Sequence, residues 1–397
     1  VRMSNNYQEV INFIRGLYQT SDFIPLHEPK FTGNEKAYLL DCIDSTYVSS
    51  VGKYVARFEQ LVAEYTGVKY AIATVNGTAA LHITLKLAGV NQGDEVITQP
   101  LSFVATCNAI SYCGAKPIFV DVDLDTLGMS PASLRAFLED NTTQTSLGCI
   151  NNKTGKNISA VVPMHTFGHP CRIDEIAKIC DEFNVSLIED AAESLGSFYQ
   201  GKHTGSFGKL AALSFNGNKT ITSGGGGMIL TDDEALARRA KHITTTAKQP
   251  HPYEFAHDEI GYNYRLPNIN AALGCAQMES LPRLLASKRD IANAYAEFFS
   301  KSNFKFVKEP VQAISNYWLN ALVLEDKEAR GDFLKDLNGA GLMSRPVWRL
   351  MNELSMFNDC QSADLTNAKW LEERVVNIPS SAIGLPRTAH ASPKDER

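Results

Sequence analysis

Short apolar, β-branched runs alternate with amphipathic stretches along most of the chain from residue 70 onwards. Apolar runs of about four to eight residues predict buried strands, and apolar residues spaced three or four apart predict helices. Because strands that alternate with helices form mostly parallel sheets covered on both faces, we expect an α/β fold with ligands beyond the strand ends. The expected strands are residues 70–74, 95–98, 117–122, 158–164, 185–189, 211–215 and 227–230. The expected helices between them are residues 78–87, 102–112 and 173–183.

Three further stretches depart from this alternation. Residues 140–157 are polar and rich in Asn and Thr, which predicts an excursion over the surface. Residues 248–258 contain two prolines and predict a loop or a boundary. Residues 266–299 are strongly helical, with an interruption expected near Pro282. The last predicted elements are a strand at residues 318–323 and a helix at residues 331–338, which suit a smaller α+β lobe.

The length of 397 residues suits two lobes with separate cores. The first residues are amphipathic and lack the apolar core and cleavage site of a signal peptide, so we expect a cytoplasmic protein that begins with a helical arm. We place this arm at residues 1–22, a large cofactor-binding domain at residues 23–249 and a small C-terminal domain at residues 250–397.

The composition limits the classes of function. The 38 Lys and Arg residues against 44 Asp and Glu leave a net charge of -6, which gives no sign of nucleic-acid binding. No apolar run reaches the roughly 18 residues of a membrane span, so none is expected. The eight cysteines are scattered without a Cys-x-x-Cys pair, which predicts reduced thiols and no metal site.

Lys219 is the first candidate for chemistry, because it follows an apolar run and precedes four glycines at residues 224–227. Most lysines are solvated surface charges, and a flexible turn beside such a lysine is the plain alternative. A lysine at the end of a buried strand can instead be desolvated, which favours the uncharged, nucleophilic amine. The order differs from that of the Walker phosphate loop, in which the lysine follows the glycines.

Asp190, Thr78, Ala79 and Phe103 stand at other strand ends or helix starts. A buried aspartate is costly unless a cation faces it, although Asp190 also suits a helix cap. Thr78 and Ala79 open a helix whose free N–H groups suit a phosphate. Phe103 suits stacking on a flat ring as well as the core.

These residues together describe a single ligand. A helix start and Ser214 hold a phosphate, Phe103 covers a ring, Asp190 pairs with a ring nitrogen, and Lys219 forms an imine. That set describes pyridoxal phosphate, for which the protein supplies orientation and electrostatics.

Seven motifs carry a resemblance that runs from about His27 to Pro386. They are Asn76-Gly-Thr-Ala-Ala-Leu-His82, Phe103-Val-Ala-Thr, Gly114-Ala-Lys-Pro-Ile-Phe-Val-Asp121, Glu189-Asp-Ala-Ala-Glu193, Ser214-Phe-Asn-Gly-Asn-Lys219, Gly261-Tyr-Asn-Tyr264 and Arg345-Pro-Val-Trp348. In these motifs the sequence resembles the sugar aminotransferases of the DegT/StrS type, which are fold-type I pyridoxal-phosphate enzymes. The resemblance implies a large domain with a mostly parallel seven-stranded sheet between helices, and a smaller C-terminal α+β domain.

The resemblance also implies roles for the matched residues. Lys219 is expected to bond the cofactor covalently and then to carry the proton between the cofactor and the sugar carbon. Asp190 is expected to pair with the pyridinium nitrogen. Glu193 corresponds to a position near the ring hydroxyl where many relatives have Gln or His, and a carboxylate there must be protonated or paired. A solvated helix residue is the alternative for Glu193.

The remaining implied roles concern the phosphate and the ring face. Thr78 and Ala79 are expected to bind phosphate through backbone N–H groups, with the Ser214 hydroxyl added, and Phe103 is expected to stack on the ring. Asn263 is similar to an asparagine that reaches the phosphate of the neighbouring subunit, which implies a homodimer with shared active sites.

Narrower marks at residues 23–29, 44–53 and 376–381 resemble the branch that makes 4-amino-4,6-dideoxy-N-acetylglucosamine nucleotides for surface glycans. We therefore expect glutamate as donor and a UDP-linked 4-keto-6-deoxy-N-acetylhexosamine as acceptor. The alternative from a nearby branch is an 8-keto-3-deoxyoctulosonate of lipopolysaccharide. The candidate substrate contacts, each of which suits packing equally well, are His165, His169, Asn316, Trp318, Arg345 and Trp348.

Three rival functions remain. A cofactor-dependent sugar dehydratase shares the fold, but such relatives have histidine in place of the lysine, so Lys219 argues against it. A non-catalytic sensor that binds the cofactor needs an attached DNA-binding segment, for which the N-terminal stretch is too short. The third is an α/β domain with none of this chemistry.

Overall fold

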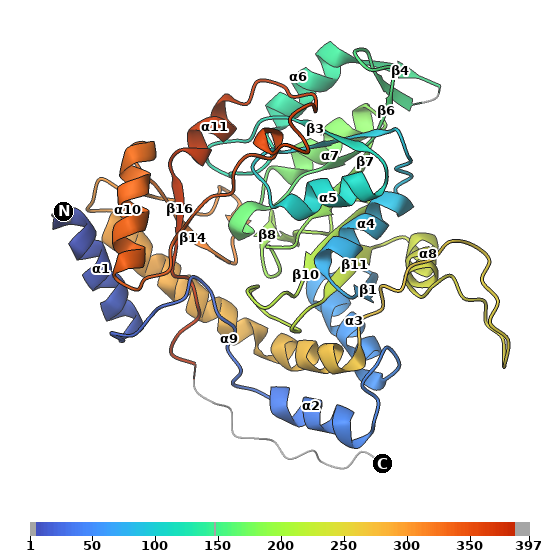
Figure 1. Cartoon of the computed structure of the whole chain (residues 1–397), viewed down its shortest axis with the longest axis horizontal. Coiled ribbons are helices and arrows are strands. Elements are labelled where there is room, and N and C mark those ends of the chain that lie inside the picture. Colours follow the sequence, from blue (N-terminus) through green and yellow to red (C-terminus); the bar gives the residue numbers. More distant parts are fainter. Residues whose placement is uncertain (1–4, 147, 386–397) are drawn as a thin grey trace.

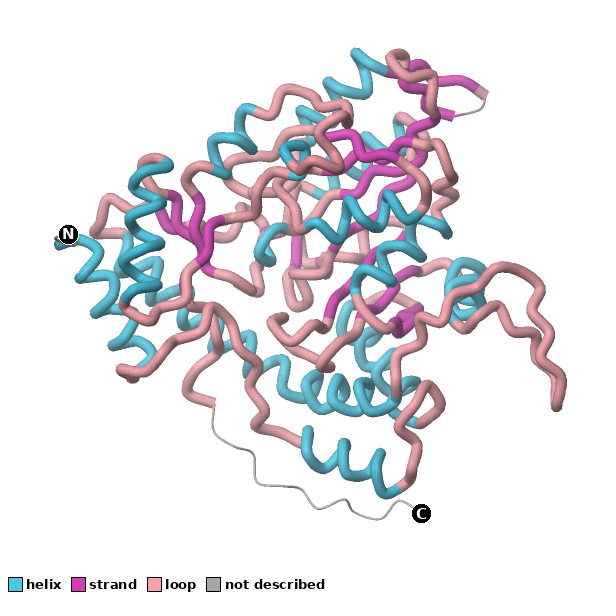
Figure 2. The backbone as a smooth tube through the Cα atoms, in the orientation of Figure 1, coloured by secondary structure: helices cyan, strands magenta, loops and turns pink. Residues whose placement is uncertain are grey.

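A computed structural model describes residues 5–146 and 148–385 of the chain. Its large sheet has the strand order β1-β11-β10-β7-β6-β2-β3, and the segment from β10 to β3 is parallel throughout. Figure 2 shows strands (magenta) inside the molecule with helices (cyan) around them. Strand β11 runs antiparallel to both of its neighbours. The bounds are β1 Tyr70–Thr74, β2 Glu95–Thr98, β3 Lys116–Phe119, β6 Asn157–Val162, β7 Ser186–Asp190, β10 Leu210–Ser214 and β11 Gly227–Thr231. The predicted mostly parallel sheet is confirmed, and these seven strands form its main path.

Helices cover both faces of this sheet because its strands are apolar on both sides. Along β1, Ile72 belongs to one core, whereas Ala71 and Ala73 belong to the other. The first core includes side chains of α4 (Gly77–Leu87), α5 (Val104–Tyr112) and α8 (Glu234–Thr244). On the opposite face lie α3 (Lys53–Thr66), α6 (Pro131–Asn141), α7 (Ile173–Glu182) and the first half of α9 (Asn268–Phe299).

The polar excursion predicted at residues 140–157 is more ordered than the sequence suggests. It contains the hairpin of β4 (Thr142–Thr145) and β5 (Gly148–Asn151), and β5 pairs antiparallel with β6. The large sheet therefore has nine strands in all. Threonine favours strands, and three of the four β4 residues are exposed, which explains why the apolar pattern gives no signal there.

The interruption predicted near Pro282 is wrong, because α9 is one continuous helix of 32 residues that contains this proline. Proline inside a helix costs about 3 kcal/mol. Burial offsets this cost, since the first half of α9 packs against the large sheet. The second half packs into a separate core with α1 (Asn5–Tyr18), α10 (Lys327–Gly339), β14 (Asn320–Val323) and β16 (Val375–Ile378). Figure 1 shows α9 running along both parts of the molecule.

A four-stranded antiparallel sheet forms the C-terminal part, in the order β12-β14-β16-β15. The smaller elements here are β12 (Lys305–Phe306), β15 (Arg345–Pro346), η2 (Met351–Glu353) and α11 (Thr366–Glu372). A third sheet consists of β13 (Ala313–Ile314), β8 (Phe198–Tyr199) and β9 (Lys202–His203), and α2 (Glu35–Asp44) packs on α9. The predicted small α+β lobe matches the C-terminal part, while the domain boundaries remain a prediction. In the described part of the chain, no helix combines the length and apolarity needed to cross a bilayer.

We predict that Asn268→Ala lowers the free energy of unfolding by about 1–3 kcal/mol. Asn268 Nδ2 donates to the carbonyl of Tyr47 at 2.7 Å, and its Oδ1 accepts from the N–H of Tyr54 at 3.0 Å. The alanine variant removes the partner of the buried Tyr54 N–H at the start of α3 and of the Tyr47 carbonyl in the preceding loop. Urea unfolding measures the change. Asn293→Ala, at an exposed position of the same helix, is the matched control and should change stability by less than about 0.5 kcal/mol.

Candidate active site

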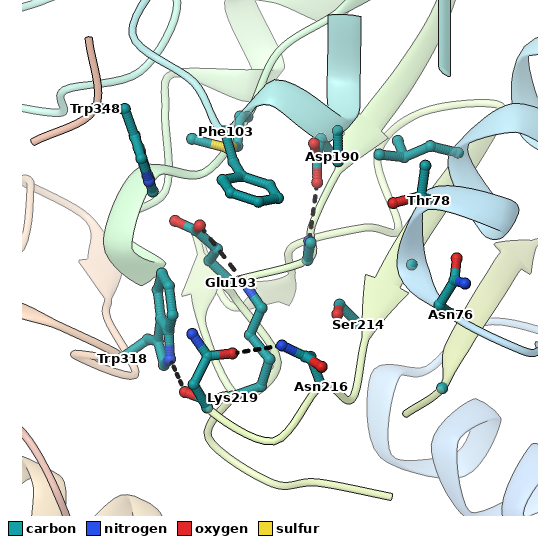
Figure 3. Close-up of a pocket in the computed structure, with 17 residues that line it drawn as sticks. Asn76, Thr78, Phe103, Asp190, Glu193, Ser214, Asn216, Lys219, Trp318 and Trp348 are labelled. Atoms are coloured by element: carbon teal, nitrogen blue, oxygen red, sulfur yellow. Dashed lines mark hydrogen bonds and ion pairs between the residues drawn. The ribbon is translucent and has the colours of Figure 1, made fainter. Parts of the chain in front are cut away.

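A cavity of about 280 Å³ lies at the carboxyl ends of β7 and β10, beside the start of α4 (Figure 3). Because β7 and β10 are parallel neighbours, their last residues, Asp190 and Ser214, reach the same edge of the sheet. The structure brings eight of the predicted site residues to the cavity wall. They are Thr78, Phe103, Asp190, Glu193, Ser214, Lys219, Trp318 and Trp348.

The start of α4 forms one wall of the cavity. Asn76 caps the helix, since its Oδ1 accepts from the N–H of Ala79 at 2.8 Å. The N–H of Ala79, predicted to bind phosphate, is therefore already bonded. Within the described residues, the N–H groups of Gly77 and Thr78 have no hydrogen-bond partner. A Cβ on Gly77 would lie 2.9 Å from the Cβ of Ser214, so only glycine lets the helix start approach this strand end.

Asp190 faces the cavity from the end of β7 and is 3% exposed. Its Oδ2 accepts from the Thr106 hydroxyl at 2.6 Å, and its Oδ1 accepts from the N–H of Ala192 at 3.1 Å. Burial raises the pKa of Asp190, and these two hydrogen bonds oppose that shift. A carboxylate has about four acceptor positions, so it can still receive a cationic N–H from the cavity.

The Lys219 side chain enters the cavity from the segment that follows β10 and is 14% exposed. Its Nζ lies 3.6 Å from Glu193 Oε1 and 4.0 Å from the centre of the Trp318 ring. The indole N–H of Trp318 donates to the carbonyl of Asn218 at 2.6 Å, which fixes the ring beside the amine (Figure 3). The Lys219 amine therefore has a defined position between an anion and an aromatic face.

Glu193 is 3% exposed, which excludes the interpretation as a solvated helix residue. Its Oε2 accepts from the N–H of Phe167 at 2.8 Å. Burial raises the pKa of Glu193 to about 7, although Lys219 and the Phe167 N–H act in the opposite direction. Near neutral pH, the cavity thus holds a carboxyl group that can bind or release a proton.

Two further aromatic side chains, Phe103 and Trp348, line the cavity. Phe103 is 50% exposed although it is a large apolar residue, and its ring centre lies 6.4 Å from that of Trp348. Trp348 also packs against Phe167, at 5.1 Å between ring centres. An exposed ring that projects into a cavity suits stacking on a flat ligand.

Three predicted substrate contacts lie outside the cavity wall and are buried in the protein. His165 Nε2 pairs with Glu189 at 2.9 Å, and His169 packs edge-on against Tyr317. The Asn316 amide donates to the carbonyls of Glu193 and Leu195, at 2.8 and 2.9 Å. These contacts agree with packing, the alternative that the sequence left open, for His165 and Asn316, whereas both buried ring nitrogens of His169 have no hydrogen-bond partner among the described residues.

Two other predicted residues are also outside the cavity of the single chain. Arg345 is exposed on β15 and bonds to the carbonyl of Ser344. Asn263 is exposed in the segment before α9 and pairs with Thr245. Neither side chain reaches the cavity from its own chain.

The sequence reasoning missed the residues that hold the site residues in place. Thr106 lies three positions after Phe103 within a recognised motif, and this spacing was the available signal for a partner of Asp190. Phe167 gave no signal in the sequence. Its backbone has a left-handed φ of 57°, a conformation that residues other than glycine seldom adopt, so the pattern does not predict it.

The donor set fits pyridoxal phosphate. The unpaired N–H groups at the start of α4 suit a phosphate, and the close approach at Gly77 forms the cradle. A buried carboxylate with spare acceptor positions suits a protonated ring nitrogen, and the Lys219 amine lies in the same cavity. All of these groups belong to a single chain.

Comparisons with known proteins agree with this geometry. The model of the DegT/DnrJ/EryC1/StrS aminotransferase family matches residues 29–383. A GDP-perosamine synthase of Escherichia coli O157:H7 is 38% identical over 358 residues, covering 90% of this chain and 93% of the relative. The putative pyridoxal phosphate-dependent aminotransferase EpsN of Bacillus subtilis is 37% identical over 336 residues, with 84% of each chain covered.

A solved structure gives the same result for the fold. The aminotransferase TlmJ of Streptoalloteichus hindustanus superposes with a TM-score of 0.81 at 26% identity, covering 90% of this chain and 93% of that chain. The predicted fold class, enzyme class and dependence on pyridoxal phosphate are confirmed. The chain belongs to the DegT/DnrJ/EryC1/StrS aminotransferase family.

Proposed function

We propose that this protein transfers an amino group from glutamate to the keto group of a nucleotide-linked sugar in the cytoplasm. The observation that carries the proposal is the Lys219 amine, held beside Glu193 in the same cavity as Asp190 and the start of α4. A sugar dehydratase on this fold is disfavoured because a lysine occupies the position where such relatives have histidine.

Residues that end or follow four strands, β1, β2, β7 and β10, would hold the cofactor. The N–H groups of Gly77 and Thr78, with the hydroxyl of Ser214, bind the phosphate. Asp190 stabilises positive charge on the ring nitrogen, and Phe103 covers one face of the ring. Pyridoxal phosphate, when bound, supplies the electron sink that the reaction needs.

Lys219 provides the acid and base of the reaction. It is the only lysine on the cavity wall within the described chain, so its Nζ takes the proton from the donor carbon and returns it to the sugar carbon. Trp318 contacts the amine, and Trp348 with Phe103 narrows the same cavity. These rings also exclude water, which strengthens the electrostatic contacts inside.

The acceptor that we propose is a UDP-linked 4-keto-6-deoxy-N-acetylhexosamine, supported by the sequence marks at residues 23–29, 44–53 and 376–381. A GDP-linked keto sugar is a second candidate, because the 38% identical relative is a GDP-perosamine synthase. The 8-keto-3-deoxyoctulosonate is the third. Trp318 and Trp348 are the predicted sugar contacts that line the cavity.

We also propose a homodimer with shared active sites. Asn263 is exposed and does not line the cavity of its own chain, as expected if it serves the partner's phosphate. Large apolar side chains are exposed on α2 and the following loop, and on the loop before Asn263. Figure 1 shows that this last loop projects from the rest of the molecule. The exposed side chains include Leu40, Ile43, Tyr47, Val51, Tyr253 and Phe255. Exposed apolar groups of this size are typical of an interface.

We predict that Lys219→Ala abolishes turnover and the covalent attachment of the cofactor. Borohydride reduction followed by peptide mass spectrometry should find the adduct on Lys219 of the wild type and on no peptide of the variant. Lys209→Ala, which replaces an exposed lysine just before β10, should keep both adduct and activity. Full activity of Lys219→Ala would refute this role.

We expect one nucleotide sugar to react faster than the other candidate acceptors in a panel assay. Purified protein is supplied with glutamate and with UDP- and GDP-linked 4-keto-6-deoxy sugars or the 8-keto octulosonate, and products are identified by mass and NMR. The UDP-linked N-acetylhexosamine should react fastest. Turnover of the octulosonate alone, or of no keto sugar, would contradict the proposal.

Shared sites predict complementation between two inactive variants. Asn263→Asp places a negative charge beside the partner's phosphate and should abolish most activity, as Lys219→Ala does. Co-expressed subunits that carry one change each should form some dimers with one intact site and regain activity. If mixed dimers form, as checked by differently tagged subunits, and stay inactive, the sites are not shared.

A further inference from the structure

Glu193 is a charged group of the cavity whose expected place near the ring hydroxyl does not explain its contact with Lys219. Among the described residues on the cavity wall, the charged side chains are Asp190, Glu193 and Lys219. Asp190 is bonded to Thr106 and Ala192, away from the amine. Glu193 alone forms an ion pair with Lys219.

Hydrogen bonds fix both the backbone and the side chain of Glu193. Asn316 donates to its backbone carbonyl at 2.8 Å, and the N–H of Phe167 donates to Oε2 at 2.8 Å. Gly168, with a φ of 92°, follows Phe167 and leaves no space for a Cβ, which would lie 1.8 Å from Asn316 Oδ1. Oε1 is thereby left for Lys219.

Asn316 also holds the second neighbour of the amine. Its Oδ1 accepts from the backbone N–H of Trp318 at 2.8 Å, so one buried amide positions both the carboxylate and the ring that flank Lys219. Several hydrogen bonds thus fix the partners of this buried ion pair, whereas a surface ion pair usually lacks such support and contributes little. This difference indicates that the contact between Glu193 and Lys219 has a function.

We propose that Glu193 is the proton-exchange partner of Lys219 in the aminotransferase reaction. The proton leaves the Lys219 ammonium, breaking an N–H bond, and binds Glu193 Oε1, forming an O–H bond; the reverse step restores the pair. No electrons are transferred to another group. The 3.6 Å separation is closed by rotation of the lysine side chain or by one bridging water. This inference rests on the proposed function of the site.

Electrostatics favour such an exchange. An ammonium with a carboxylate and an amine with a carboxylic acid both have zero net charge, so no charge enters or leaves the buried cavity. The groups that face Glu193 are Lys219 and the Phe167 N–H, which lower its pKa, and Asp190, which raises it. Burial dominates and brings the pKa of Glu193 to about 7, where proton exchange is most efficient near neutral pH.

Glu193→Gln tests the proposal, because glutamine keeps an acceptor for the Phe167 N–H but cannot exchange a proton. In the wild type, kcat should rise with pH through about 7 as Glu193 ionises. In Glu193→Gln this ascending limb of the pH–rate profile should vanish. The kcat should fall by roughly 10²-fold, with KM changed much less. Glu193→Asp should recover part of the rate and the limb. Glu139→Gln, an exposed carboxylate on α6, should match the wild type.

Infrared titration of the cofactor-free protein gives a readout that does not depend on activity. The wild type should show a carboxylic-acid band that disappears as pH rises through about 7 and that Glu193→Gln lacks. In Lys219→Ala the midpoint of this band should move to higher pH, because the nearby positive charge is gone. If the wild type transfers no amino group but shows this band and its shift, the proposed function is refuted, while the pairing of Glu193 with Lys219 stands. A variant Glu193→Gln that keeps the limb and the full rate, or a midpoint unmoved in Lys219→Ala, overturns the inference.

Discussion

The contact between the Lys219 amine and the Glu193 carboxylate, 3.6 Å apart beside the Trp318 ring, is the interaction on which the site depends. A buried ion pair is tolerated only when hydrogen bonds fix its geometry. The Phe167 N–H, the Asn218 carbonyl and the Asn316 amide meet this requirement from three segments far apart in the sequence. The C-terminal part of the chain thus completes a site whose chemistry belongs to the large sheet.

The strand order explains why these groups meet. Parallel pairing of β7 with β10 sets Asp190 opposite Ala212, so that Asp190 and Ser214 end at the same edge of the sheet. Antiparallel pairing of β11 with both β1 and β10 sets Gly227 beside Thr74 and Ser214. The start of α4 and the segment that contains Lys219 are thereby brought to the same cavity.

The sequence predicts most of this arrangement, because apolar runs define the strands and parallel strands align their ends. The positions of Lys219, Asp190 and Ser214 follow from that pattern, and the matched motifs identify the ligand. The course of α9 through Pro282 does not follow, since tertiary burial outweighs the local preference of proline. The sequence leaves two alternatives for His165, His169 and Asn316, because a polar residue at a strand end or loop looks alike whether it contacts a ligand or a buried partner.

The buried site also illustrates a cost of function. Asp190 and Glu193 are carboxyl groups whose burial raises their pKa, and a chain selected for stability alone would place apolar residues there. The most direct test is a crystal structure of the protein grown with pyridoxal phosphate. The account predicts continuous density from Lys219 Nζ to the cofactor, with the ring nitrogen facing Asp190 and the phosphate at the N–H groups of Gly77 and Thr78. A phosphate bound elsewhere, or a ring nitrogen that faces away from Asp190, would contradict it.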